Sequence, residues 1–274
     1  MGKPRIAVHK FSSCDGCQLQ FLTLEQELLI LAERVDIVHF HEATSQFTPG
    51  PYDVSFVEGS VSARENLGRI KQIREESRYL VVIGACGTAG GIQALRNWGK
   101  LDAFLRAVYA SPAYIDILEY STPFSDHVKV DAELWGCPPD QGQLKRVLTD
   151  LLVGVTPRMP TESVCIQCKR DGNVCVLVAK GEPCMGPITR TGCGALCPHQ
   201  ERDCYGCFGP QGGGNIKALG RRFLGLGLSP EAVSRRLRFI YGWEPAFREA
   251  AKDWDVNGSH YTPLPPRRAP GKPS

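Results

Sequence analysis

The segment Tyr79–Gly84 (YLVVIG), followed directly by Ala85-Cys86-Gly87, decides the fold class of this chain. A short apolar run closed by glycine is typical of a strand that is covered on both faces of a sheet. The turn after this run carries a cysteine. We therefore expect the strand to present a thiol at its carboxyl end.

Strand and helix patterns alternate on both sides of this segment, over the first ~150 residues. Strands that alternate with helices imply βαβ units and a mostly parallel sheet covered on both faces, so the predicted fold class is α/β. The other predicted strands are Arg5–Phe11, Val35–Phe40, Val54–Val57 and Val128–Leu134. The predicted helices are Gln18–Glu33, Ala63–Arg78, Gly91–Trp98 and Gln141–Leu152.

The alternating pattern stops near Thr156–Pro160, and residues 165–214 hold eight cysteines with little periodic apolar content. Such a stretch needs metal or disulfides to become ordered. Helical patterns return at Asn215–Leu226 and Ser229–Trp243. We predict a sheet domain at 1–156, a cysteine-rich domain at 157–214, a helical segment at 215–261 and a mobile tail at 262–274.

Composition narrows the class of protein and its location. The 274 residues include 32 basic and 29 acidic side chains, a balance that gives no broad electrostatic reason to bind nucleic acid. No apolar run approaches the ~18 residues of a membrane span, and no secretory signal opens the chain. We expect a cytoplasmic protein without a membrane partner. Cysteine-rich chains in that compartment favour metal or redox chemistry over a disulfide framework.

Four of the twelve cysteines follow predicted strands of the sheet domain. Because ligands bind outside the carboxyl ends of the strands in an open α/β sheet, these thiols are expected at one edge. Four thiolates fit zinc or a [4Fe–4S] cluster. Structural zinc usually takes two local pairs, whereas this set has one pair and two distant singles, which favours a cluster. The set is Cys14, Cys17, Cys86 and Cys137.

The other eight cysteines form the run C-x2-C-x6-C-x8-C-x8-C-x3-C-x6-C-x2-C. Eight thiolates are enough for two cubane clusters, and two four-cysteine zinc sites are the structural alternative. With the first set, twelve cysteines make three groups of four with none left over, which favours three clusters. Their grouping stays open, because one ligand crosses between clusters in two-cluster ferredoxins. The eight are Cys165, Cys168, Cys175, Cys184, Cys193, Cys197, Cys204 and Cys207.

Five motifs together resemble the small subunit of a [NiFe]-hydrogenase. The resemblance covers about residues 4–215 and is nearest to the small (delta) subunit of cytoplasmic, bidirectional, NADP-linked hydrogenases, also called sulfhydrogenases. The motifs are SSCDGCQL at 12–19, PYDVSFVEGSV at 51–61, GACGTAGGIQAL at 84–95, GCPP at 136–139 and CGALCPHQERDCYGCFGP at 193–210.

The resemblance implies a flavodoxin-like first domain whose four cysteines, Cys14, Cys17, Cys86 and Cys137, hold a proximal [4Fe–4S] cluster. The eight later cysteines would hold the medial and distal [4Fe–4S] clusters. The nickel–iron centre would belong to a large partner subunit. This chain would be the non-catalytic electron-transfer subunit of an oxidoreductase that acts on hydrogen. It would pass electrons from H2 reversibly to flavin-containing and Fe–S subunits that reduce NAD(P).

Glu58 in the VEGS run follows a predicted strand and would face the same edge as the proximal cluster. The resemblance implies a proton-relay carboxylate, or an extra contact to the cluster. A solvated or helix-capping acid is the simpler alternative.

Three other functions stay open from the residues. One is the equivalent subunit of a deazaflavin-reducing or heterodisulfide-reductase-linked hydrogenase, since those relatives share the cysteine-rich extension. Another is a cluster subunit of a quinone-type oxidoreductase. The third is a zinc-rich interaction module without a redox role.

Overall fold

The computed structural model describes residues 2–255 and confirms the α/β prediction. Five parallel strands form the central sheet in the order β2-β1-β3-β5-β7. This is the flavodoxin-like order, in which the chain starts near the middle and winds to both sides. The strands are β1 (Arg5–Lys10), β2 (Asp36–Phe40), β3 (Tyr52–Glu58), β5 (Ser77–Ile83) and β7 (Ala132–Leu134).

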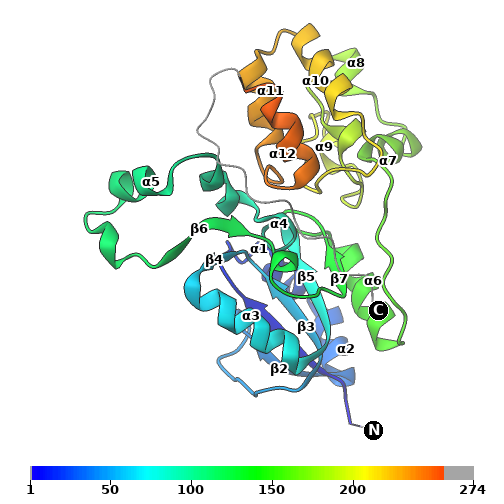
Figure 1. The fold of residues 1–274 in the computed structure, drawn as a ribbon. Coiled ribbons are helices and arrows are strands. Elements are labelled where there is room, and N and C mark those ends of the chain that lie inside the picture. Colours follow the sequence, from blue (N-terminus) through cyan, green and yellow to red (C-terminus); the bar gives the residue numbers. More distant parts are fainter. Residues whose placement is uncertain (1, 256–274) are drawn as a thin grey trace, which may run out of the picture.

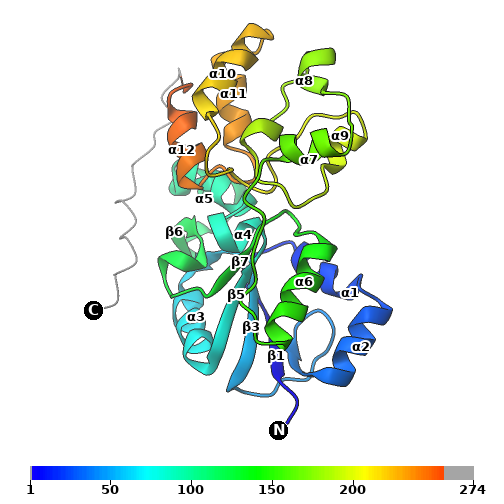
Figure 2. The same ribbon diagram turned by 90° about the vertical axis from the view of Figure 1, so that its right-hand side faces the viewer.

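Helices cover both faces of this sheet, as Figure 2 shows from its edge. On one face lie α1 (Gly16–Leu22), α2 (Gln26–Arg34) and α6 (Gln141–Leu152), whose apolar side chains pack on Val8 and Phe56. On the other lies α3 (Arg64–Glu76), with a cluster that includes Ile70, Leu80 and Val82. Alternate residues of β5 therefore enter two different clusters, as the two-sided burial of a parallel strand requires.

A smaller unit projects from the sheet domain at the left of Figure 1. The strands β4 (Val61–Ala63) and β6 (Ile117–Thr122) pair antiparallel. Between β5 and β6 the chain forms α4 (Gly84–Ala89), the 3-10 helix η1 (Ile92–Trp98), α5 (Leu101–Val108) and the 3-10 helix η2 (Pro112–Tyr114). The 3-10 helix η3 (Phe124–Asp126) follows β6. No residue of α5 is buried, so the part of this unit beyond η1, which we call the arm, contributes little to the core.

Several element boundaries differ from the sequence prediction. The predicted helix Gln18–Glu33 is two helices, because the chain turns at Thr23–Glu25 and Glu25 adopts a positive φ of 48°. The predicted helix Gly91–Trp98 is the 3-10 helix η1. The predicted strand Val128–Leu134 forms only over Ala132–Leu134, and β6 was not predicted. Each miss involves a short element whose conformation depends on tertiary packing more than on local periodicity.

The cysteine-rich part consists of short helices joined by long loops. These are α7 (Val164–Arg170), α8 (Val176–Ala179), η4 (Gly186–Ile188) and α9 (Leu196–His199). Three longer helices follow: α10 (Ile216–Gly225), α11 (Pro230–Leu237) and α12 (Pro245–Lys252). The predicted helix Ser229–Trp243 ends at Leu237 instead, and α12 is a separate helix. Ser229 caps α11, since its hydroxyl accepts a hydrogen bond from the Ala232 N–H.

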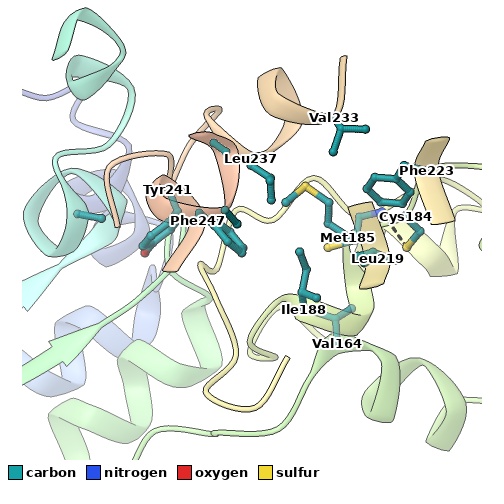
Figure 3. Close-up of a cluster of buried hydrophobic side chains, with 14 of the residues drawn as sticks. Val164, Cys184, Met185, Ile188, Leu219, Phe223, Val233, Leu237, Tyr241 and Phe247 are labelled. Atoms are coloured by element: carbon teal, nitrogen blue, oxygen red, sulfur yellow. Dashed lines mark hydrogen bonds between the residues drawn. The ribbon is translucent and has the colours of Figure 1, made fainter. Parts of the chain in front are cut away.

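One hydrophobic cluster joins the cysteine-rich part to the C-terminal helices (Figure 3). Met185 and Ile188 from the cysteine-rich part pack with Phe223, Leu237 and Phe247 from the three helices. The core that the cysteine-rich stretch lacks by itself is therefore supplied in part by residues that follow it.

Among residues 2–255, no helix is both long and apolar enough to cross a membrane. The tail predicted to be mobile, 262–274, and the end of the predicted segment 215–261 lie outside the described residues.

Candidate metal centres

The four cysteines of the sheet domain come from the carboxyl ends of three strands. Cys14 follows β1, Cys17 lies in α1, Cys86 lies in α4 directly after β5, and Cys137 follows β7. In Figure 1 these strand ends point toward the cysteine-rich part. Cys17 is buried, whereas Cys14 is exposed. The edge that holds these thiols thus has one side open to solvent.

The four thiols lie close enough together for each to influence the pKa of its neighbours. Burial raises the pKa of Cys17 well above its ordinary value, and the charges of Glu58, Cys86, Cys137 and Cys14 raise it further. Burial and the neighbouring thiols Cys137 and Cys14 raise the pKa of Cys86 to about 12. Four thiolates this close together repel one another, so they need a bound cationic centre to stay deprotonated together. This donor set fits an iron–sulfur cluster.

The backbone around these cysteines approaches the sulfur atoms closely. Gly84 has a φ of +81°, and a Cβ there would lie 2.2 Å from Cys17 Sγ. The Ala85 N–H donates to the Gly136 carbonyl at 2.8 Å, which ties the turn after β5 to the turn after β7. Only glycine fits at position 84 without displacing the thiol. This close approach also fits a cluster, whose properties depend on backbone dipoles near the sulfurs.

Glu58 ends β3 beside this site and is fully buried. Its Oε1 accepts a hydrogen bond from Gln18 Nε2 at 2.6 Å and lies 3.1 Å from Ser13 Oγ, while no nitrogen or oxygen among residues 2–255 is hydrogen-bonded to its Oε2. Burial raises the pKa of the Glu58 carboxyl, and the nearby Asp15 acts in the same direction. Ser13 Oγ also lies 2.9 Å from Asp15 Oδ1, and Asp15 pairs with Lys10 at 2.6 Å. A chain of polar contacts therefore leads from the buried Glu58 through Ser13 to Asp15 and Lys10, which are half-buried.

Four of the later cysteines surround one small cavity of about 30 Å³. Its wall also includes Val164, Val176 and Leu177, so it is largely apolar. Burial and the thiols of Cys175 and Cys168 raise the pKa of Cys165. The four cysteines are Cys165, Cys168, Cys175 and Cys184, which we name the outer group.

We name the four remaining cysteines the middle group, and they are Cys193, Cys197, Cys204 and Cys207. Burial, together with Cys193, Cys197 and Cys137, raises the pKa of Cys207 to about 12. The Cys204 N–H donates to Cys184 Sγ of the outer group at 3.2 Å. The middle group is thus close enough to Cys137 of the sheet-domain site for their charges to interact, and it contacts the outer group at Cys184. The three groups form a row.

The twelve predicted ligands are all free thiols in the structure, and none forms a disulfide. Within residues 2–255, no three of the His, Cys, Asp and Glu side chains converge closely enough to hold a single metal ion.

Several residues around these cysteine groups were not predicted from the sequence. Gln18 follows the CDGC motif, and Trp135 directly precedes GCPP, so closeness to a motif was their only signal. Thr88 and Tyr241 hydrogen-bond to each other across the boundary between the sheet domain and the C-terminal helices. Nothing in the local sequence around Tyr241 points to the cysteines.

Comparison with known sequences places the first domain in a described family. Residues 14–151 match the family described as NADH ubiquinone oxidoreductase, 20 Kd subunit. The match begins at the first cysteine of the sheet-domain set and ends inside α6.

Individual relatives extend the similarity to the cysteine-rich part. The chain is 34% identical over 239 residues to "Sulfhydrogenase 2 subunit delta" of Pyrococcus furiosus, which covers 87% of this chain and all of that protein. It is 31% identical over 235 residues to a vhu subunit of the F420-non-reducing hydrogenase of Methanocaldococcus jannaschii, which covers 75% of this chain and 81% of that one.

A chain of a solved NAD+-reducing [NiFe]-hydrogenase in the H2-reduced state is 33% identical, with a TM-score of 0.54. The match covers 96% of that chain but 58% of this one. The similarity is thus confined to a part of this chain about the size of the sheet domain.

Proposed function

Because the chain belongs to the family of the NADH ubiquinone oxidoreductase 20 Kd subunit, and within it to the hydrogenase small subunits, we propose that it is the electron-transfer subunit of a soluble [NiFe]-hydrogenase. Electrons would pass between a nickel–iron centre in a large partner subunit and a flavin- or Fe–S-containing partner. The row of three four-cysteine groups carries this proposal.

In this proposal each group holds one [4Fe–4S] cluster, which when bound supplies a site for one electron. The sheet-domain set would hold the cluster nearest the large subunit, the middle group the next and the outer group the last. Cys137 and Cys207 would be the neighbouring ligands of the first two, and Cys204 and Cys184 those of the last two.

Around these ligands, the chain excludes water and fixes the thiols. Phe208 is buried and packs close to the backbone of Gly136 and Gly192, between the sheet-domain set and the middle group. Val164 and Val176 line the cavity of the outer group and are also buried. Dry surroundings strengthen each electrostatic contact to a bound cluster, so these side chains would help to set its potential.

We place the large subunit at the open edge beside Cys14. Apolar side chains are exposed around this edge, with Leu19 and Ile92 each 48% exposed and Leu95 41%. The arm that continues from η1 adds Val108, which is 72% exposed. Exposed apolar side chains that gather at a functional edge are typical of a protein interface.

The final acceptor distinguishes two candidate functions. Reduction of NAD(P), in the cytoplasm, is the first, as in the sulfhydrogenase type. Delivery of electrons to a heterodisulfide-reductase type of partner is the second. We retain this second candidate because one relative, similar over 75% of this chain, belongs to an F420-non-reducing hydrogenase, which is not named for NAD(P) reduction.

We also propose that Glu58 holds a proton for relay at the edge that faces the large subunit. Its Oε2 is buried beside Cys17, and Ser13 connects its other oxygen to the half-buried Asp15. Replacing Glu58 by Gln should lower H2 oxidation by roughly 10²-fold. Dithionite should still reduce the clusters fully. An unchanged rate with full cluster content would reject the relay.

The proposal is tested by metal analysis of protein purified without air. About twelve irons and twelve sulfides per chain, with a nickel-containing protein copurifying, are expected from three cubane clusters. Zinc near three with little sulfide would reject electron transfer and leave a zinc-rich interaction module. A copurifying quinone-reducing complex without nickel would point to the quinone-type oxidoreductase instead. Adding NAD+ or NADP+ under H2 then identifies the acceptor.

A further inference from the structure

Tyr241 lies in the turn between α11 and α12, 105 residues after Gly136 in the sequence. Its side chain is 1% exposed, and its ring stacks on Trp135 with the ring centres 5.1 Å apart and an interplanar angle of 6°. Figure 3 shows it on the side of the C-terminal cluster that faces the sheet domain. It thus reaches from the last part of the chain to the turn that carries Cys137.

The hydroxyl of Tyr241 belongs to a chain of buried hydrogen bonds. The Gly136 N–H donates to Tyr241 Oη at 3.0 Å. Thr88 Oγ1 lies 3.2 Å from Tyr241 Oη and 2.9 Å from the Gly84 carbonyl oxygen. Each hydroxyl has a single proton. The Gly136 N–H donates to Tyr241, so Tyr241 can donate its proton to Thr88 and Thr88 can donate its own to the Gly84 carbonyl. Every donor and acceptor in this chain then has a partner.

Both ends of this hydrogen-bond chain lie beside cysteines of the sheet-domain set. Gly136 directly precedes Cys137, and Gly84 lies two residues before Cys86. The Gly136 carbonyl also accepts the Ala85 N–H at 2.8 Å, so both polar groups of the Gly136 peptide are fixed. The hydroxyl therefore holds two ligand-bearing turns in one relative position.

The Tyr241 ring also contacts the segment that carries the middle group. A Cβ on Gly209, two residues after Cys207, would lie 2.8 Å from Tyr241 Cδ1 and 2.5 Å from Trp135 Cζ3. The Arg190 guanidinium lies over the Trp135 ring at 4.1 Å, and the Arg190 N–H donates to the Gly209 carbonyl. The stacked rings of Trp135 and Tyr241 thus pack against the segment that follows Cys207, beside the contact between Phe208 and Gly136.

We propose that Tyr241 is a positioning residue that fixes the ligand turns of Cys86 and Cys137 through its hydroxyl and their spacing from Cys207 through its ring. This inference rests on the proposed function, since it assumes that a cluster occupies the sheet-domain set. It assigns to the C-terminal helices a role at a site whose four ligands all lie in the first domain.

The test is Tyr241→Phe in the anaerobically purified complex. Phenylalanine keeps the stacked ring but leaves the buried Gly136 N–H without its acceptor. We expect a shifted midpoint potential for the cluster whose paramagnetic signal disappears in Cys17→Ser, with the other two signals unchanged. Chelators should also extract iron from that cluster about fivefold faster, the factor that corresponds to losing one hydrogen bond of ~1 kcal/mol.

Tyr79→Phe is the matched control, because its hydroxyl contacts the Asp131 carbonyl at 3.4 Å and reaches no cysteine turn. Thr88→Val breaks the same hydrogen-bond chain from its other side and should shift the same potential, even if Tyr241→Phe does not fold. Equal potentials and iron-release rates in Tyr241→Phe, Thr88→Val and Tyr79→Phe would overturn the role of Tyr241. A wild-type chain without iron and sulfide would instead reject the proposed function.

Discussion

The sheet domain and the cysteine-rich part arrange their thiols by different means. In the sheet domain, parallel strands end at a common edge, and the cysteines occupy the turns that follow. In the cysteine-rich part, thiols sit on short helices and loops, and Cys184 and Cys204 are themselves part of the hydrophobic cluster. The first arrangement has a core of its own, whereas the second depends on its cysteines and on helices from later in the chain. We therefore expect the two regions to respond differently to loss of metal.

The largest expected effect comes from removing iron. Chelation under reducing conditions should increase proteolytic cleavage within residues 165–214 on the order of tenfold, because bound metal contributes directly to the stability of such a segment. Cleavage within residues 2–151 should change little. The two hydrophobic clusters that cover the sheet consist of apolar side chains, and among their described members Cys17 alone is a cysteine, so their packing does not depend on metal. Mass spectrometry of the fragments checks this. If chelation changed cleavage equally in both regions, the two regions would not differ in their dependence on metal.

Replacing Gly84 by Ala should act on the sheet-domain site alone. The added Cβ would lie 2.2 Å from Cys17 Sγ, and the φ of +81° is unfavourable for alanine, so about four of the twelve irons expected from the three proposed clusters should be lost. Gly68→Ala in α3 is the control, because no atom lies within 4 Å of a Cβ there. Iron analysis of both variants measures the difference. A full complement of iron in Gly84→Ala would show that the turn after β5 can shift to accommodate the added Cβ.

Acid should destabilise the sheet domain through His9. Burial, with the nearby His39 and Arg69, lowers the pKa of His9 to about 3 in the folded protein. The unfolded chain therefore takes up a proton first as the pH falls below about 6.5. The free energy of unfolding decreases by up to ~1.4 kcal/mol per pH unit between about pH 6.5 and about pH 3.

Anaerobic thermal unfolding at pH 7.0 and 5.5 measures this dependence. His9→Phe should lose most of the pH dependence, whereas replacing the exposed His41 by Gln should keep it. An identical pH response in the wild type and His9→Phe would assign the acid sensitivity to another group.

The smallest effect is expected at the cap of α11. Ser229→Ala removes the acceptor for the Ala232 N–H and should cost about 1 kcal/mol. The loss should appear in hydrogen exchange of α11 and α12, which are in contact, and not in the strands of the sheet. Equal loss of protection in the sheet would mean that the two regions unfold as one unit.

The elements that the sequence predicted well are those with a strong local pattern. The helix Gln141–Leu152 matches α6 at both ends, and the YLVVIG run lies within β5 except for its glycine. The cysteines at 14, 17, 86 and 137 were expected at one sheet edge because parallel strands end together, and the structure brings them there. The break at Thr23–Glu25 was missed, because leucines continue at helical spacing across it.

By itself, the sequence determined the fold class, the position of the first four thiols and the family, since hydrophobic periodicity and cysteine spacing are local properties of the chain. The tertiary structure decided which of the eight later cysteines are neighbours, since spacing along a loop does not determine proximity in space. It also decided the surroundings of those thiols. Tyr241 reaches Gly136 across 105 residues, and such a contact forms only when separate segments pack against a common core.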